Sequence, residues 1–195
     1  MSRLAVLLML AATPVHAHGA LPGRGGFYAG ALHPLVSLDH LVALLAIGLL
    51  LSQRDLRAGL GLLILGTMAG LALPFAGVQF AAAGMPLLGI AIIAGARLAF
   101  ARPLPGWAAL GLSLASGLCI GLQTDVPMDT GLMAATAGAG VVLAAFLIAA
   151  YAMAIGTVTR GLLHGVPIRV AGSWIVAIAV MMLAFLLRDM LGFTA

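Results

Sequence analysis

Long stretches of this sequence contain no charged residue. The run from 131 to 156, for example, has no Asp, Glu, Lys, Arg or His. About 20 consecutive apolar residues in a helix are enough to cross the hydrocarbon core of a bilayer. The whole chain is 64% hydrophobic and 7% charged, with a mean hydropathy of +1.23, far from the composition of a soluble domain. The sequence therefore predicts a protein that crosses a membrane several times.

Six apolar runs follow one another, separated by short gaps that contain arginine, proline or other polar residues. Together they predict an all-α fold, a polytopic membrane bundle of about six transmembrane helices over residues 34–195. Two glycine pairs with GxxxG spacing, Gly66 with Gly70 and Gly117 with Gly121, favour close helix contacts. The predicted spans are 34–51, 58–73, 82–100, 107–122, 131–156 and 170–187.

Residues 1–17 have the layout of a secretory signal peptide. Arg3 precedes a short apolar core, and Val15-His16-Ala17 forms a small-residue cleavage site. The alternative is an uncleaved first helix, although the apolar core is short for a membrane span. Cleavage after Ala17 gives a mature chain that begins at His18. Residues 18–33 then form an external Gly-rich segment.

The arginines predict the orientation of the chain, which contains no lysine. Six of them fall in gaps on one side of the predicted spans, and positive residues are enriched on the cytoplasmic side of membranes. The mature amino terminus then lies outside the cytoplasm. Because these basic residues are topology signals, we expect the lipid bilayer, and not nucleic acid, as the partner of this cationic chain. The six are Arg54, Arg57, Arg97, Arg102, Arg160 and Arg169.

Residues 33–40, His-Pro-Leu-Val-Ser-Leu-Asp-His, place three ionisable side chains at the start of the first span. Each costs roughly 2.5–3.5 kcal/mol near the bilayer centre, so such residues usually have a function. Pro34 suits the first position of a helix. On one helix His33 and His40 share a face, with Asp39 beside His40.

Two imidazoles and a carboxylate can bind one divalent ion, because imidazole suits nickel, cobalt, copper and zinc and the carboxylate offsets charge. His33, Asp39 and His40 are therefore the candidate metal ligands. One alternative is a proton relay, since Asp and His also serve that purpose in membranes. The other is structural, with His33 capping the helix and Asp39 bonding to a neighbouring helix.

The amino-terminal signal, the His/Gly-rich start of the mature chain and the HPxxGxDH-like motif at the first span resemble the HupE/UreJ family. Here the motif residues are His33, Pro34, Asp39 and His40. These small bacterial membrane proteins are regarded as nickel or cobalt permeases linked to hydrogenase and urease maturation. The resemblance implies a metal-transport role for the two histidines and Asp39. It also implies a multi-pass location in the bacterial inner membrane and metalloenzyme maturation proteins as partners.

The chain departs from the family pattern at two places. Ser37 stands where the motif usually has Gly. Many members also carry a His- and Glu-containing motif in a later helix, whereas residues 117–125 read Gly-Leu-Cys-Ile-Gly-Leu-Gln-Thr-Asp. Gln123 and Asp125 are the candidates for the acidic role, and copper remains an alternative to nickel.

Further candidate ligands are methionines and the mature amino terminus. Met85, Met128 and Met133 lie near the outer ends of their predicted spans, where thioethers suit Cu(I), although Met is also an ordinary packing residue. His18, as a free amino terminus, could chelate an ion through its amine and imidazole. The methionines belong to the copper alternative, whereas the alternative for His18 is a disordered start of the mature chain.

The predicted function is import of a divalent transition-metal ion, nickel first and cobalt next. Alternatives are a copper importer that uses the same site with the methionines, and a membrane assembly factor that binds metal without conducting it. No GxxxxGK[ST] motif is present, nor a GxGxxG motif after a strand, so neither nucleotide-driven transport nor an organic cofactor is expected. No HExxH motif or Ser–His pair supports an enzyme.

Overall fold

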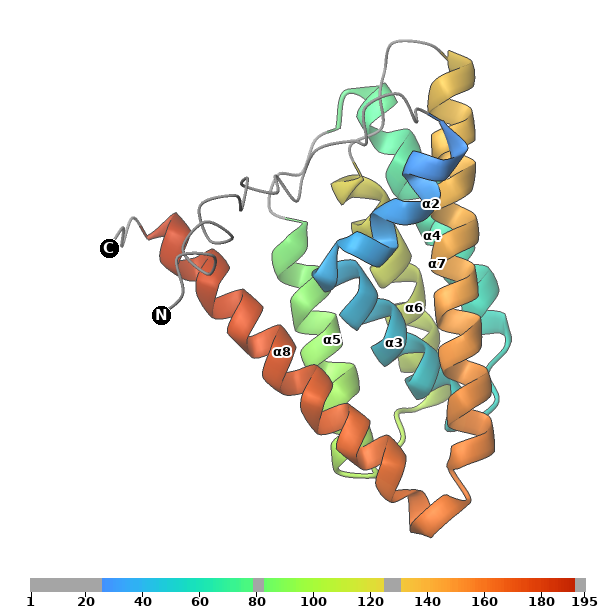
Figure 1. Ribbon diagram of the computed structural model, residues 1–195, viewed down its shortest axis with the longest axis vertical. Coiled ribbons are helices and arrows are strands. Elements are labelled where there is room, and N and C mark those ends of the chain that lie inside the picture. The colour runs from blue at the N-terminus through green and yellow to red at the C-terminus, as the bar shows by residue number, and fades with distance from the viewer. Residues whose placement is uncertain (1–25, 79–82, 125–130, 192–195) are drawn as a thin grey trace, which may run out of the picture.

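A computed structural model describes residues 26–78, 83–124 and 131–191, and within them the chain is helical with no strand (Figure 1). The helices form one bundle, so the predicted all-α membrane fold is confirmed. The elements are α2 (Phe27–Val36), α3 (Leu38–Ser52), α4 (Ala58–Ala72), the short 3-10 helix η1 (Leu73–Ala76), α5 (Gly84–Ala99), α6 (Gly106–Gln123), α7 (Gly131–Thr159), the 3-10 helix η2 (Leu162–Gly165) and α8 (Val166–Met190).

Each predicted span contains helix, but not every helix is long enough to cross a membrane. In the described part of the chain, four stretches pass on length and apolarity, and five pass if the bent pair α2–α3 counts as one span. The third predicted span, 82–100, contains α5, which has 16 residues, and residue 82 lies outside the described residues. Pro86 lies in the first turn of α5, a position that suits the start of a helix. The helix accordingly begins only at Gly84.

The first predicted span is two helices rather than one. α2 begins at Phe27, before the predicted start at Pro34, so part of the segment predicted to be external is helical. Pro34 lies inside α2, where it has no amide hydrogen for an intrahelical bond. Ser37 then adopts an extended backbone, with φ −85° and ψ 105°. The axes of α2 and α3 consequently meet at a bend of 78°.

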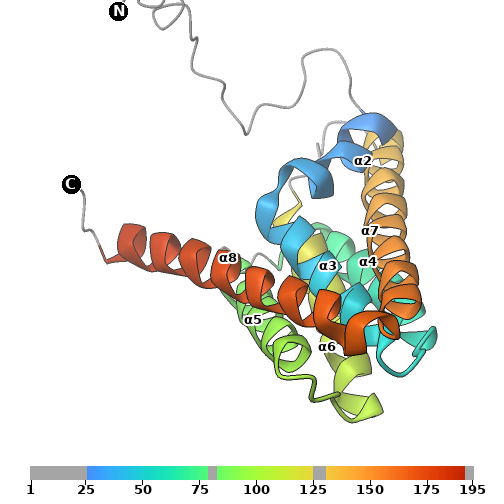
Figure 2. The ribbon, with the colours of Figure 1, turned by 60° about the horizontal axis from the view of Figure 1, so that its bottom comes forward.

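α3 is the central helix of the bundle. Most of its residues are buried, including a continuous apolar segment from Leu49 to Leu51. α7 packs along both α2 and α3, whereas α5 packs mainly against α8. α8 leans away from the other helices towards its carboxyl end (Figures 1 and 2). α3 is therefore enclosed by protein, and α8 keeps much of its apolar surface exposed.

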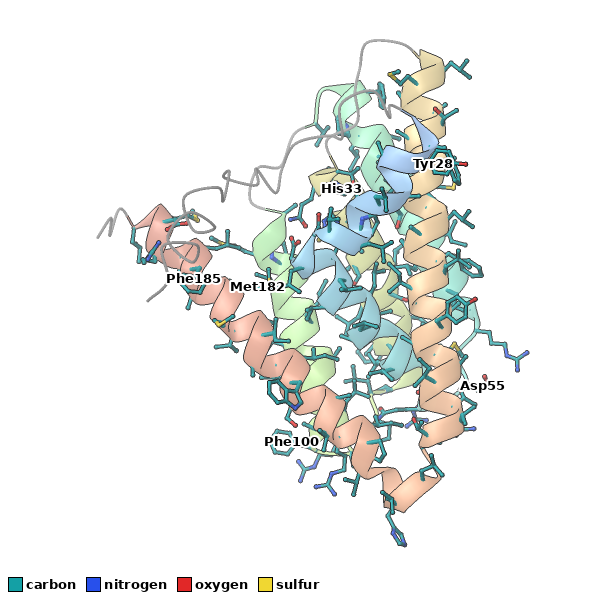
Figure 3. The ribbon with its side chains drawn as sticks, viewed as in Figure 1. Tyr28, His33, Asp55, Phe100, Met182 and Phe185 are labelled. Atoms are coloured by element: carbon teal, nitrogen blue, oxygen red, sulfur yellow. The ribbon has the colours of Figure 1, made fainter. Side chains whose placement is uncertain are left out.

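Arginines gather at the end of the bundle where α3, α5 and α7 finish and α4, α6 and α8 begin. Two of them bind carbonyl oxygens at helix ends: Arg160 Nη1 donates to Ser52 O over 3.0 Å, and Arg169 Nε donates to Ala99 O over 3.2 Å. Asp55 and Phe100 mark this end in Figure 3, opposite His33. The structure thus separates the cationic end from the motif residues.

The two predicted GxxxG motifs pack against each other. Gly66 and Gly70 on α4 face the backbone of α6, and Gly117 and Gly121 on α6 face the backbone of α4. This is the most extensive helix contact in the described structure. Small residues permit such close backbone approach. A hydrogen bond between the same two helices stabilises the contact: Oγ of the buried Ser113 donates to Gly59 O over 2.9 Å.

Gly117→Ala should destabilise this contact. A Cβ at residue 117 would overlap the carbonyl oxygen of Leu63 and lie 2.8 Å from Thr67 N, and overpacking of this kind costs about 1–3 kcal/mol. Gly111→Ala on the same helix is the matched control, because a Cβ there meets open space. Thermal unfolding of the two purified variants in detergent compares them. Equal melting temperatures would contradict the close packing.

Candidate metal site

His33 and His40 meet across the break between α2 and α3. Their ring centroids are 5.1 Å apart, with ring planes at 62°. His33 is half-buried on α2, whereas His40 on α3 is only 1% exposed. The prediction that they share a face of a single helix is wrong, because the chain bends at Ser37. The bend itself brings the two imidazoles together.

Asp39 lies beside His40 in the first turn of α3, half-buried. Its Oδ2 accepts a hydrogen bond from Gln123 Nε2 over 2.9 Å. Gln123 is the last residue of α6 and also lies near His40. The predicted structural alternative for Asp39, a bond to a neighbouring helix, is thus present in the structure. The same bond brings Gln123, a predicted candidate ligand, to the motif.

A fourth helix reaches this point through Gly84, the first residue of α5. A Cβ built on Gly84 would lie 3.0 Å from Gln123 Nε2. Gly84 is absent from the residues predicted from the sequence, and only its position before Met85-Pro86 at a helix start could have drawn attention to it. The polar cluster of His33, Asp39, His40 and Gln123 therefore lies where α2, α3, α5 and α6 converge.

Two atoms of the cluster are buried and neither donate a hydrogen bond to, nor accept one from, the residues that the structure describes. They are His40 Nδ1 and Gln123 Oε1. Buried polar atoms without partners are uncommon in proteins, and each one calls for an explanation, such as an ion or a water molecule. A ring nitrogen and an amide oxygen are both able to bind a cation.

The described side chains do not by themselves form a complete metal cage. Across residues 26–78, 83–124 and 131–191, no three His, Cys, Asp or Glu side chains converge closely enough to hold an ion. The structure instead pairs His33 with His40 and Asp39 with Gln123. Closure around an ion would need side-chain movement within this cluster.

The other predicted candidates are distributed more widely. Met85 is half-buried in the first turn of α5, next to Gly84, and Met133 is 39% exposed near the start of α7. His18, Asp125 and Met128 lie outside the described residues. Met85 is thus the methionine, among the predicted candidates that the structure describes, whose sequence neighbour Gly84 lies against the polar cluster.

The fold and this cluster define a class: a small polytopic helical membrane protein with ionisable side chains gathered inside its bundle. The model of the family described as HupE / UreJ protein matches residues 6–182, and the chain belongs to this family. The family is associated with nickel and cobalt transport and is one of transporters and accessory proteins rather than enzymes. No curated protein and no solved structure matches the chain.

Proposed function

We propose that this protein imports a divalent transition-metal ion, nickel first and cobalt next, through a site built from His33, Asp39 and His40. The observation that carries the proposal is the meeting of two imidazoles across the α2–α3 break, with a carboxylate adjacent to one of them. Imidazole nitrogen suits these borderline ions, and the carboxylate offsets part of their charge. Neither a proton relay nor a purely structural role accounts as directly for two histidine rings in contact.

The broken first span supports a transport role. Many transporters hold ions where a membrane helix is interrupted, because the interruption exposes carbonyl oxygens and polar side chains within the bundle. Here the two histidines lie on opposite sides of the interruption at Ser37 in the sequence, and their rings lie against each other in space. Asp39 keeps capacity for an ion, since a carboxylate has two oxygens and about four lone-pair sites.

The orientation follows from the charged ends of the bundle. The arginine-rich end should face the cytoplasm, which places the His/Asp cluster towards the periplasm. In this proposal the signal peptide is removed, the mature amino terminus is periplasmic and the membrane is the bacterial inner membrane. Ions released at the arginine-rich end would then be available to metalloenzyme maturation proteins.

Competition uptake tests the choice of ion. Cells that express the protein should accumulate radioactive nickel, and excess Co²⁺ should reduce this accumulation more than Zn²⁺ or Mg²⁺ does, because nickel and cobalt share the proposed site. Cells that express Asp39→Asn provide the background.

Two other results would each favour a different function. Copper accumulation without nickel accumulation would favour the copper importer, for which Met85 beside Gly84 provides a nearby thioether. Metal binding by the purified protein without accumulation in cells would instead favour the non-conducting assembly factor.

A further inference from the structure

We propose that Gln123 is the positioning residue of the metal site, holding the Asp39 carboxylate in the direction that a bound cation requires. The inference rests on the proposed function. It adds to the site a residue from α6 that is distant from the first-span motif in the sequence. The contact that carries it is the bond from Gln123 Nε2 to Asp39 Oδ2, 2.9 Å long and joining residues 84 positions apart.

The direction of this bond is fixed by chemistry. An ionised carboxylate only accepts hydrogen bonds, so the amide must turn its nitrogen towards Asp39. Its oxygen, Oε1, then points elsewhere, and it is buried without a hydrogen-bond partner in the described structure. Among the described residues, hydrogen bonding therefore accounts only for the nitrogen side of the Gln123 amide. Carboxylates that bind metals are commonly oriented by such outer partners.

Because Gly84 has no side chain, it leaves room for the side-chain amide of Gln123. Because a Cβ on residue 84 would be 3.0 Å from Gln123 Nε2, an alanine there would displace the amide or require α5 to shift. Gly84→Ala therefore disturbs the Gln123–Asp39 bond without changing either partner. A Cβ on Gly89 of the same helix would meet nothing within 4 Å, so Gly89→Ala is its matched control.

The neutral charge of Gln123 is part of the inference. Asp39 is the one acidic side chain that the described structure places in this cluster, so the cluster has a single negative charge. An exchange of the two groups, Asp39→Asn together with Gln123→Glu, preserves one carboxylate, one amide and a hydrogen bond between them. If positioning of that carboxylate is what matters, the exchange should recover binding that Asp39→Asn alone has lost.

The test is titration of the purified protein in lipid nanodiscs with a metal ion, with binding measured by calorimetry. The probe is whichever of Ni²⁺, Co²⁺ and Cu²⁺ the wild-type protein binds most tightly. Gln123→Met should weaken binding by about 10- to 100-fold, the usual effect of losing an outer partner of a metal ligand. Gly84→Ala should weaken it in the same direction. Gly89→Ala should bind as the wild type does.

Gln53→Met is the control for Gln123→Met, since Gln53 also has a buried Oε1 without a hydrogen-bond partner in the described structure but follows α3 at the arginine-rich end. Wild-type protein that binds none of the three ions would overturn the proposed function and this inference together. Binding that is lost in Asp39→Asn but unchanged in Gln123→Met would overturn only the role of Gln123. Failure of the exchanged pair to bind better than Asp39→Asn would count against positioning as well.

Discussion

Asp39→Asn should reduce metal uptake per membrane-inserted protein almost to background, a loss of more than about 100-fold, because it removes a metal ligand rather than an outer partner. Asparagine keeps the size of the side chain and can still accept the hydrogen bond from Gln123. What it removes is the negative charge that offsets the charge of the ion inside an apolar bundle. The measurement is radioactive nickel uptake, normalised to the amount of protein in the membrane fraction.

Asp55→Asn is the matched control for this variant. Asp55 lies at the arginine-rich end, where it pairs with Arg57 over 3.4 Å with half of its side chain exposed, and exposed pairs contribute little to stability. Its uptake should equal that of the wild type. Normal uptake per inserted Asp39→Asn protein would refute the metal site, and poor insertion with normal specific uptake would favour the structural role.

His40→Ala should cause a loss nearly as large, whereas His33→Ala should be milder. His40 is 1% exposed, so no solvent is at hand to replace its ring nitrogen as a ligand. His33 is half-buried on the other side of the break, where a water molecule can take the place of the imidazole. Uptake per inserted protein, compared at several nickel concentrations, measures the two losses.

His164→Ala provides the control for both histidine variants, because His164 is exposed in η2 at the arginine-rich end of the bundle. It should leave uptake unchanged. A larger loss in His33→Ala than in His40→Ala would reverse the proposed ranking. Wild-type uptake in His40→Ala would remove the buried imidazole from the site altogether.

Much of the fold can be predicted from the sequence because membrane helices are encoded locally. A run without charges must lie in an apolar setting, and the arginines between runs mark one end of the bundle. The GxxxG spacing likewise predicts a close contact at Gly66 and Gly117. It does not say which helix is the partner, because that depends on how the whole bundle packs.

The bend in the first span is harder to predict. Proline suits the first turn of a helix and also interrupts one, so Pro34 alone does not distinguish a helix start from a break within the motif. The structure decides for the break, with α2 beginning at Phe27 and the turn falling at Ser37. The sequence therefore predicts the pairing of His33 with His40, but for the wrong geometric reason.

The Asp39–Gln123 bond lies beyond what local patterns contain. Its partners are 84 residues apart and meet because α3 and α6 are both held in the bundle by other contacts. Gln123 can be named as a candidate from its place where many family members carry a later motif, but its partner cannot. For Gly84 the local sequence indicates at most a helix start before Met85-Pro86, and not its role, which comes from the space that it leaves for a side chain of another helix.

Rotation of α2 about the bend at Ser37 would move His33 on a short arm. His33 lies four residues from the bend, which is about 6 Å along α2 at a rise of 1.5 Å per residue. A swing of α2 through about ten degrees therefore displaces His33 by about 1 Å, half the length of a metal–nitrogen bond of about 2 Å. Because Gly30 on α2 faces the backbone of α7 and Gly140 on α7 faces that of α2, the spacing of the two imidazoles is set by how α2 rests on α7. In the proposed import function, a movement of that one helix on α7 would open or close the spacing of the two imidazoles around an ion.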